Sequence, residues 1–379
     1  RDQPRSRGLG DVYKRQIHDC KGRSLKMEQK EMAKTRLIIY VLMAYGLTYL
    51  MGILMWYGST RGYDLTVFPT AQMMYPAAGV IIGLFLAHKG EKILPAGFFI
   101  TVLATTGVLI VLALLSVFLP VNDLNIAGMT MSVYNLISQY ILIIGSIVAL
   151  VFLAVAGNEK RAAAGLTRQN WKSAVLIVLA FVGIYIVRTV VSVAVQGVSD
   201  GSGMQYVKEW AAMFKNPMMW LNIAALPINY FFVFIAFFGE EYGWRYYLQP
   251  VLQKRFGLRA GVIILGVVWG LWHIPDDLFY YTQTSGIQMI FAQQITCISL
   301  GIFFAYAYMK TQNIWVPVCL HYLNNNLIPI ISGTFSADVL ENQTVSWKDL
   351  PVALVLNGLC FGFFLLADVF KKKEVQEEE

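Results

Sequence analysis

The chain has 379 residues, of which 57% are hydrophobic and only 14% are charged, and its mean hydropathy is +0.55. Soluble globular domains carry about 25% charged residues, so this composition excludes an ordinary soluble protein and predicts an integral membrane protein. The net charge of +7 does not indicate nucleic-acid binding, because the Lys and Arg residues gather at the ends of apolar runs, where they orient a membrane protein.

The first residues of the chain differ from the rest. Segment Asp11–Gln16, with the sequence DVYKRQ, reads as the translation of a sequencing adapter. We therefore expect residues 1–26 to be an artefactual or disordered leader, and this segment takes no part in the predicted fold.

Apolar runs follow one another along the remaining chain. A helix needs about 20 apolar residues to cross the hydrocarbon core of a bilayer. Ten runs meet or approach this length: Leu37–Tyr57, Val67–Ala87, Leu94–Leu119, Val133–Ala156, Ala174–Val195, Met218–Phe238, Ala260–Ile274, Ile287–Met309, Ile314–Ile331 and Val352–Phe370. The seventh run is short and ends before Pro275. It continues through Asp277 to Tyr281 only if the polar side chains of that segment are buried in protein.

Basic residues mark every second connection between these runs. The connections rich in Lys and Arg are Lys26–Arg36, His88–Lys92, Lys160–Lys172, Arg245–Arg259, Lys310 and Lys371–Lys373. By the positive-inside rule, both termini and the segment after Glu241 lie in the cytoplasm. The sequence thus predicts an all-α, polytopic transmembrane helix bundle of about ten spans, with eight or nine spans as alternatives.

Two adjacent glutamates, Glu240 and Glu241, follow the sixth run. A charge at the bilayer centre costs about 3 kcal/mol, so such residues face a partner or a cavity. Neighbouring positions on a helix differ by about 100°, so the two carboxylates cannot share one environment. Arg245 follows Glu241 by four residues and lies near the same face. We therefore predict that Arg245 neutralises Glu241 and that Glu240 faces a cavity.

Two histidines also lie inside apolar runs, His273 in GVVWGLWHIP and His321 in PVCLHYLNNNL. Asn325 follows His321 by four residues, so these two side chains share one helix face. A carboxylate, two imidazoles and an amide are the groups needed to hydrolyse a peptide bond. The base takes a proton from water, donors stabilise the oxyanion, and an acid protonates the leaving amine. This set of residues favours an amide hydrolase.

Depth in the membrane is the main objection to one common site. Glu240 lies at the predicted inner end of its run, whereas His273 lies near the outer end of the next run. At about 1.5 Å per residue this separates them by ~20 Å. The objection disappears if Trp244–Leu248 stays in the membrane and if the next run passes Pro275. We expect both, together with a water-filled cavity that opens to the cytoplasm.

Three patterns in chain order carry a family resemblance: Glu240-Glu241-xxx-Arg245, Trp269-xxx-His273 and His321-xxx-Asn325. Together they resemble the CPBP family, which comprises the CAAX prenyl proteases of the Ras-converting type and bacterial bacteriocin-processing or self-immunity homologues. The resemblance covers Met218–Ile331. Trp269 stands where the family often has Phe, a departure that leaves the register of the following His unchanged.

The resemblance implies an intramembrane endopeptidase with six site residues: Glu240, Glu241, Arg245, His273, His321 and Asn325. Glu240 and His273 would activate the water, and His321 and Asn325 would line the oxyanion site. The remaining Glu and Arg would order the first glutamate. Residues 27–215 would then hold the N-terminal transmembrane helices, 216–335 the catalytic core, and 336–379 the last transmembrane helix and a charged cytoplasmic tail.

The metal requirement stays open at this point. The family is often called a metalloprotease family, and Glu240, His273 and His321 are residue types that hold a zinc ion with one open position. The chain lacks the H-E-x-x-H helix that is usual in zinc proteases. We expect chemistry that requires no cofactor and keep Zn as the alternative.

Two other functions remain as alternatives. A transporter would account for intramembrane polar groups outside the three patterns: Arg188, Asn222, Asn229, Gln293 and Gln294. Transporters commonly consist of repeated halves, and no internal repeat is evident in the sequence. We expect Arg188 to pair with a buried carboxylate or to extend toward the membrane surface. The second alternative is a catalytically silent family member that serves in bacteriocin immunity or as a scaffold, although all six site positions are filled.

The expected partners are the membrane lipid bilayer and a protein or peptide substrate at the membrane, with no nucleic acid. A bacterial plasma membrane is the expected location. The sequence identifies neither the substrate and its cleavage site nor the oligomeric state.

Overall fold

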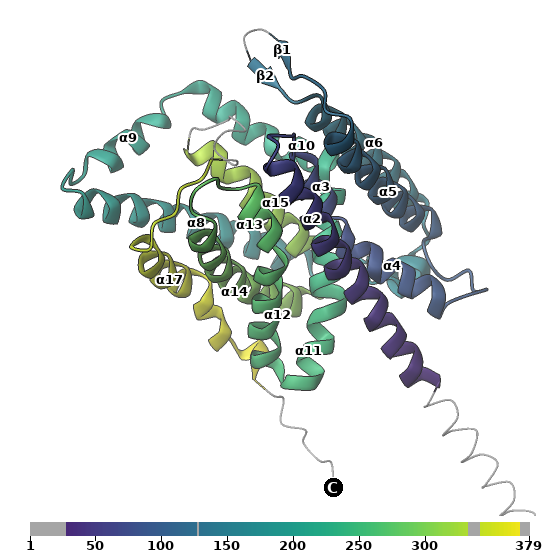
Figure 1. Cartoon of the computed structure of the whole chain (residues 1–379). Helices are drawn as coiled ribbons and strands as arrows, with labels where there is room; N and C mark the ends of the chain where they lie inside the picture. The colour runs from purple at the N-terminus through teal and green to yellow at the C-terminus, as the bar shows by residue number, and fades with distance from the viewer. Residues whose placement is uncertain (1–27, 127–128, 333–341, 372–379) are drawn as a thin grey trace, which may run out of the picture.

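The computed structural model describes residues 28–126, 129–332 and 342–371 (Figure 1). Within these ranges, eight helices are long and apolar enough to cross a membrane: Glu28–Ser59, Val67–Ala87, Ala96–Phe118, Val133–Val155, Trp171–Ser199, Pro217–Phe256, Leu258–Phe279 and Gly286–Thr311. The prediction of an all-α, polytopic bundle is confirmed, and the chain is an integral multi-pass membrane protein. The predicted leader, residues 1–26, lies outside the described residues.

The first helix (Glu28–Ser59) contains a π-helical turn, η1 (Leu42–Gly46), and ends with α2 (Leu47–Ser59). The further α-helices are α3 (Val67–Gln72), α4 (Tyr75–Ala87), α5 (Ala96–Phe118), α6 (Val133–Val155), α7 (Asn158–Ala163), α8 (Trp171–Ser199), α9 (Gln205–Met213), α10 (Pro217–Glu241), α11 (Gln249–Phe256), α12 (Leu258–Trp272), α13 (Ile274–Phe279), α14 (Gly286–Thr311), α15 (Trp315–Ser332) and α17 (Asp349–Cys360). A short antiparallel hairpin, β1 (Leu124–Ile126) and β2 (Met129–Met131), joins α5 to α6 at one end of the bundle (Figure 1). The other helical segments are η2 (Tyr242–Leu248), η3 (Gly362–Leu366) and η4 (Asp368–Phe370).

The described part of the chain contains eight membrane-length apolar helices, which is one of the predicted alternatives, rather than the expected ten. The ninth predicted run forms α15, and His321 with the asparagines at 324–326 lowers the hydropathy of this helix. The tenth run, predicted as Val352–Phe370, is shorter than expected, because α17 ends at Cys360 and the chain continues in the 3-10 turns η3 and η4. Gly362 near this end costs about 1 kcal/mol of helix propensity relative to Ala.

Both described chain ends lie at the same end of the bundle. In Figure 1 the first helix begins, and the yellow ribbon at the end of the described chain stops, in the lower part of the picture, where α11 also lies. This arrangement agrees with termini on one side of the membrane. That this side is the cytoplasm stays a prediction.

The sixth membrane helix (Pro217–Phe256) runs through α10, η2 and α11 without a break. Its π-helical section η2 begins directly after Glu241, and Trp244 and Leu248 within it are buried. A π-helical turn inserts an extra residue into an α-helix and is frequent at functional sites. The helix therefore continues through Trp244–Leu248, and the location of this segment within the membrane stays a prediction.

The seventh membrane helix (Leu258–Phe279) passes from α12 through His273 into α13. Pro275 lies in the first turn of α13, where backbone N–H groups have no acceptor within the helix. The missing N–H of proline therefore costs no helical hydrogen bond there. Asp276 and Asp277 are buried, with exposed fractions of 3% and 0%. The aspartate side chains after Pro275 are therefore buried in protein. This is the condition under which the sequence predicts that the run continues past Pro275.

Two glycines bring the glutamate-bearing helix close to its neighbours. Gly239 and Gly243 lie four residues apart on α10 and η2. A Cβ atom on Gly239 would lie 2.4 Å from the carbonyl oxygen of Met73, and one on Gly243 would lie 2.2 Å from Cβ of Pro76. Small residues at this spacing let transmembrane helices approach closely. They hold the helix against the corner between α3 and α4, which fixes the depth and rotation of the two glutamates.

Candidate active site

The end of α10 and the start of η2 place a salt bridge in the centre of the bundle. Glu241 and Arg245 are both 0% exposed, and Arg245 Nε donates to Glu241 Oε2 at 2.9 Å. The predicted pairing of these two residues is confirmed. Breaking such a buried pair from one side leaves an uncompensated charge, so both partners are tied to the stability of the fold.

Further contacts hold the guanidinium of Arg245 in place. Its Nη1 donates to the carbonyl oxygen of Gly301 on α14 at 3.4 Å. Its Cζ atom lies 5.0 Å from the ring centre of Trp269 and 5.5 Å from that of Phe304. Cations at such distances from aromatic faces are stabilised by the ring quadrupole. Arg245 is therefore a fixed cation that links three helices.

Glu240 has a different set of partners. Trp269 Nε1 on α12 donates to its Oε2 atom at 2.9 Å, and Trp244 Nε1 donates to the same oxygen at 3.3 Å. Indole N–H groups are neutral donors, so they orient the carboxylate without cancelling its charge. The side chain is only 2% exposed. The prediction that Arg245 pairs with Glu241 and not with Glu240 is confirmed, whereas Glu240 packs against two indole rings instead of facing the predicted cavity.

His321 on α15 lies between the two glutamates. Its Nδ1 atom is 2.9 Å from Glu241 Oε1, and its Nε2 atom is 4.0 Å from Glu240 Oε1. Because the paired carboxylate of Glu241 is an acceptor, the Nδ1 atom is the one that carries a proton in this arrangement. The imidazole is packed among the rings of Phe237, Trp269 and Phe304, which fix its plane.

His273 lies at the end of α12, one turn after Trp269, and is 7% exposed. Its ring packs against Trp272 and Trp269, with ring centres 4.8 Å and 6.0 Å away. Among the described residues, its Nδ1 atom has no hydrogen-bond partner, and no ion pair joins it to a carboxylate. His273 thus contacts Trp269, which donates to Glu240. Among the described residues, His273 is not itself bonded to the glutamates or to His321.

Asn325 is the exposed member of the predicted set. It lies one turn after His321 on α15, and its Oδ1 atom accepts a hydrogen bond from Asn324 Nδ2 at 2.9 Å. Within the described ranges, no hydrogen bond joins it to the other five site residues. The group that Asn325 offers to a ligand is therefore its amide nitrogen.

Sequence reasoning missed four residues of this region. Trp269 was part of a pattern without an assigned role, and Trp244 had no role at all, although it follows Glu240 by four residues. Asp276 Oδ1 and both carboxylate oxygens of Asp277 are buried without a hydrogen-bond partner in the part of the chain that the structure describes. The signal for the aspartates was their position three and four residues after a buried histidine.

The proposed zinc ligands do not form a metal site in this arrangement. Among the described residues, no three His, Cys, Asp or Glu side chains come close enough together to hold a metal ion. Glu240 Oε1 and His321 Nε2 are 4.0 Å apart, and the other nitrogen of His321 is engaged by Glu241. The donor set of Glu240, His273 and His321 therefore does not fit zinc as it stands.

The expected water-filled cavity is not visible at these residues. All of the predicted site residues except Asn325 are at most 7% exposed. Two surface grooves of the protein are lined by other side chains, one at α11 and one between the first helix and α13. The site is closed in this structure, and access from the cytoplasm stays a prediction.

Three of the five polar residues that a transporter would use, Arg188, Asn229 and Gln294, form hydrogen bonds between helices. Arg188 Nε donates to Asn357 Oδ1 on α17, which corrects the expectation of a carboxylate partner or an extended side chain. Asn229 donates to the hydroxyl of Tyr322 at 3.2 Å. Hydrogen bonds across transmembrane helices stabilise their packing. These contacts give the bonded polar groups a structural role in helix packing.

Comparison with known proteins supports the protease alternative. Residues 222–327 match the family model described as "Type II CAAX prenyl endopeptidase Rce1-like". The chain is 27% identical over 125 residues to CAAX prenyl protease 2 of Methanococcus maripaludis, an alignment that covers 31% of this chain and 45% of the relative. The chain thus spans less than half the length of this curated relative. No solved structure matches the chain. The matched segment contains all six predicted site residues, and the predicted family resemblance is confirmed over it.

Proposed function

We propose, from the family match and the buried carboxylate site, that this protein is an intramembrane endopeptidase in which Glu240 activates a water molecule. The observation that carries the proposal is the arrangement around this one carboxylate. Trp269 and Trp244 both donate to Oε2, while Oε1 faces His321 Nε2 across 4.0 Å. A carboxylate oriented in this way presents a defined oxygen as a general base.

A water molecule within hydrogen-bond distance of Oε1 and Nε2 completes the arrangement. The two atoms are too far apart for a direct hydrogen bond, and a polar gap of this size is commonly bridged by water. Glu240 takes the proton of this water as the water attacks the peptide carbonyl. Apolar surroundings strengthen Glu240 as a base, and Arg245 pairs with Glu241 rather than with Glu240.

His321 supplies positive charge to the reaction. Since its Nδ1–H donates to Glu241, its Nε2 atom stabilises an oxyanion only when it too carries a proton. The charges of Glu240, Glu241, Arg245 and a doubly protonated His321 then sum to zero, which suits a buried cluster. Donors aimed at a developing oxyanion in such a site contribute factors of about 10²–10³ to the rate.

His273 and Asn325 have the remaining roles. The Nδ1 atom of His273 has no protein partner among the described residues, so it is available to water or to the leaving amine. Asn325, exposed one turn beyond His321, offers its amide nitrogen to the substrate carbonyl. We assign His273 to proton transfer and Asn325 to the oxyanion.

The substrate class follows from the location of the site. A carboxylate buried among membrane helices reaches peptide bonds only in proteins or peptides associated with the membrane. The relative from Methanococcus maripaludis is named CAAX prenyl protease 2, and we propose for this chain the broader class of membrane-associated substrates. A bacterial plasma membrane remains the proposed location.

Membrane proteomics tests the function directly. Cells that produce the wild type should contain cleaved peptide termini that are missing from cells with Glu240→Gln, in which uncleaved precursors accumulate. Glu209→Gln, on the exposed helix α9, is the matched control and should behave as wild type. If both variants yield the wild-type pattern, the protein is a silent family member and the proposed function is wrong.

Metal dependence requires a separate measurement. We expect purified, active wild type to contain no stoichiometric zinc and to keep its activity after treatment with a chelator, because the described His and carboxylate groups do not gather into a three-ligand set. Elemental analysis of wild type and His321→Ala decides the question. Stoichiometric zinc that disappears in His321→Ala would contradict metal-free chemistry while keeping the protease function.

A further inference from the structure

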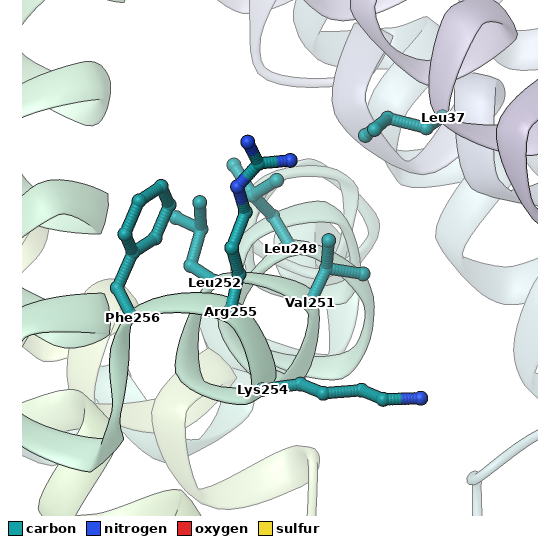
Figure 2. A pocket seen from close by; sticks show the side chains of 7 residues that line it. All are labelled: Leu37, Leu248, Val251, Leu252, Lys254, Arg255 and Phe256. Carbon is teal, nitrogen blue, oxygen red and sulfur yellow. The ribbon is translucent and has the colours of Figure 1, made fainter.

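A groove with a volume of about 580 Å³ lies between the first helix and α11, away from the active site. Figure 2 shows its lining, with one leucine on the first helix facing the α11 side chains across the gap. The lining residues are Leu37, Leu248, Val251, Leu252, Lys254, Arg255 and Phe256. The volume is within the range of small-molecule sites, which is roughly 300–1,000 Å³.

The lining combines an apolar wall with two cations. Lys254 and Arg255 are exposed, and Arg255 Cζ lies 5.5 Å from the ring of Phe256, which is itself 47% exposed. Within the described ranges, neither cation has a carboxylate partner. The sequence contains no Asp or Glu between Glu241 and Asp276. Among the described residues, both positive charges are therefore available to an anionic ligand.

The position of the groove matches a membrane boundary. α11 is the last part of the sixth membrane helix, and Gly257, with a φ of 88°, turns the chain directly into α12. In Figure 1, α11 lies at the end of the bundle where both described chain ends lie. The pattern of Lys and Arg predicts this end to be cytoplasmic, and anionic lipids are enriched in the cytoplasmic leaflet.

We propose that this groove is a binding site for an anionic glycerophospholipid. The headgroup phosphate contacts Lys254 and Arg255, and an acyl chain lies along Leu37, Leu248 and Leu252. Basic pockets between transmembrane helices bind such headgroups on the cytoplasmic side. A free phosphate would use only the two cations and leave the apolar wall empty. A zwitterionic lipid would fill the wall without matching the charge.

A lipid in this groove contacts the first helix and the η2–α11 segment. Side chains from both of these segments also pack next to Glu240. Tyr40 on the first helix packs on Trp244 and Tyr247, with ring centres 6.1 Å and 5.0 Å away. Trp244 donates to Glu240, and Leu248 of the groove directly follows Tyr247. The bound lipid clamps the first helix to η2 and α11 and thereby stabilises the packing behind the active site. The binding site itself does not depend on the proposed protease function.

Native mass spectrometry of the purified protein, titrated with phosphatidylglycerol or with phosphatidylcholine, tests the site. The wild type should retain phosphatidylglycerol in preference to phosphatidylcholine. Each Lys or Arg near a membrane surface contributes about fivefold to anionic lipid affinity, so the double variant Lys254→Gln/Arg255→Gln should bind phosphatidylglycerol about 25-fold more weakly. The control Lys89→Gln/Lys92→Gln removes the same charge from an exposed connection and should bind as wild type. Equal loss in both double variants would overturn the proposal.

A second variant tests the groove rather than its charge. Val251→Trp fills the apolar wall and leaves both cations in place, so it should also weaken retention of phosphatidylglycerol. Val175→Trp adds the same side chain at an exposed position of α8 as the control. Melting temperatures measured in lipid-free detergent verify that each variant is folded. Wild-type retention of phosphatidylglycerol by folded Val251→Trp would overturn the groove as the site.

Discussion

Two pairs of adjacent acids, Glu240–Glu241 and Asp276–Asp277, are buried in the bundle, and among the described residues only the first pair forms salt bridges. Glu241 is bonded to Arg245 and to a histidine, and Glu240 accepts two indole N–H groups. In the part of the chain that the structure describes, Asp276 Oδ1 and both oxygens of Asp277 have no hydrogen-bond partner. Two pairs of adjacent carboxylic acids therefore have different environments within one bundle.

The local sequence explains part of this difference. Arg245 follows the glutamates by one helical turn, whereas no Lys or Arg occurs between Arg259 and Lys310 around the aspartates. Buried polar atoms are almost always hydrogen-bonded, and buried water supplies the partner where protein does not. The glutamates thus form an ordered ionic cluster, whereas the carboxyl groups of the aspartates have no ionic partner among the described residues.

Loss of the catalytic base should have the largest effect. Glu240→Ala and His273→Ala should each lower turnover by about 10²–10⁴ or more, because each removes a proton-transfer group. Peptide-cleavage assays on purified, folded protein measure this effect. Turnover close to that of wild type in either variant would show that the reaction uses another base or acid.

Removal of the cation should separate stability from chemistry. Arg245→Ala leaves Glu241 as an uncompensated buried charge, so the free energy of unfolding should fall by about 3–5 kcal/mol. Glu241→Gln should destabilise in the same way, and Glu240→Gln should not. Melting temperatures in detergent measure this, with Lys208→Ala on the exposed helix α9 as the control. Equal melting temperatures for all variants would contradict the structural role of the pair.

Asn325→Ala should show an intermediate effect confined to catalysis. If its amide donates to the oxyanion, kcat should fall by about 10²–10³ while KM changes little, since the hydrogen bond matters in the transition state. Asn158→Ala, at an exposed position of α7, is the matched control. A change in KM alone would indicate that Asn325 binds the ground state of the substrate instead.

Asp277→Asn should have the smallest effect on stability. The amide keeps the size of the side chain, and no ion pair is broken, so the free energy of unfolding should change by less than about 1 kcal/mol. Glu241→Gln is the direct comparison in the same melting assay. A loss as large as that of Glu241→Gln would mean that Asp277 has a cationic partner, and the contrast between the two acid pairs would disappear.

The sequence by itself determined the features that depend on one segment at a time. Hydropathy and length predict a membrane bundle, because each span must bury its own backbone in lipid. The pairing of Glu241 with Arg245 follows from helical periodicity, since residues four apart lie on one face. Ordered patterns in three apolar runs predicted the family resemblance that the match to residues 222–327 supports.

The tertiary structure decided which segments meet. Trp269 reaches Glu240 from 29 positions away, and His321 reaches Glu241 from 80 positions away, and no periodicity within a helix predicts such contacts. Close packing at Gly239 sets the depth of the glutamates, because a larger side chain there would clash with the backbone of Met73. The sequence pattern predicts which side chains share a helix face and which of them are charged. Only the packed bundle decides which helix faces touch, because contacts between helices depend on the shape of both surfaces.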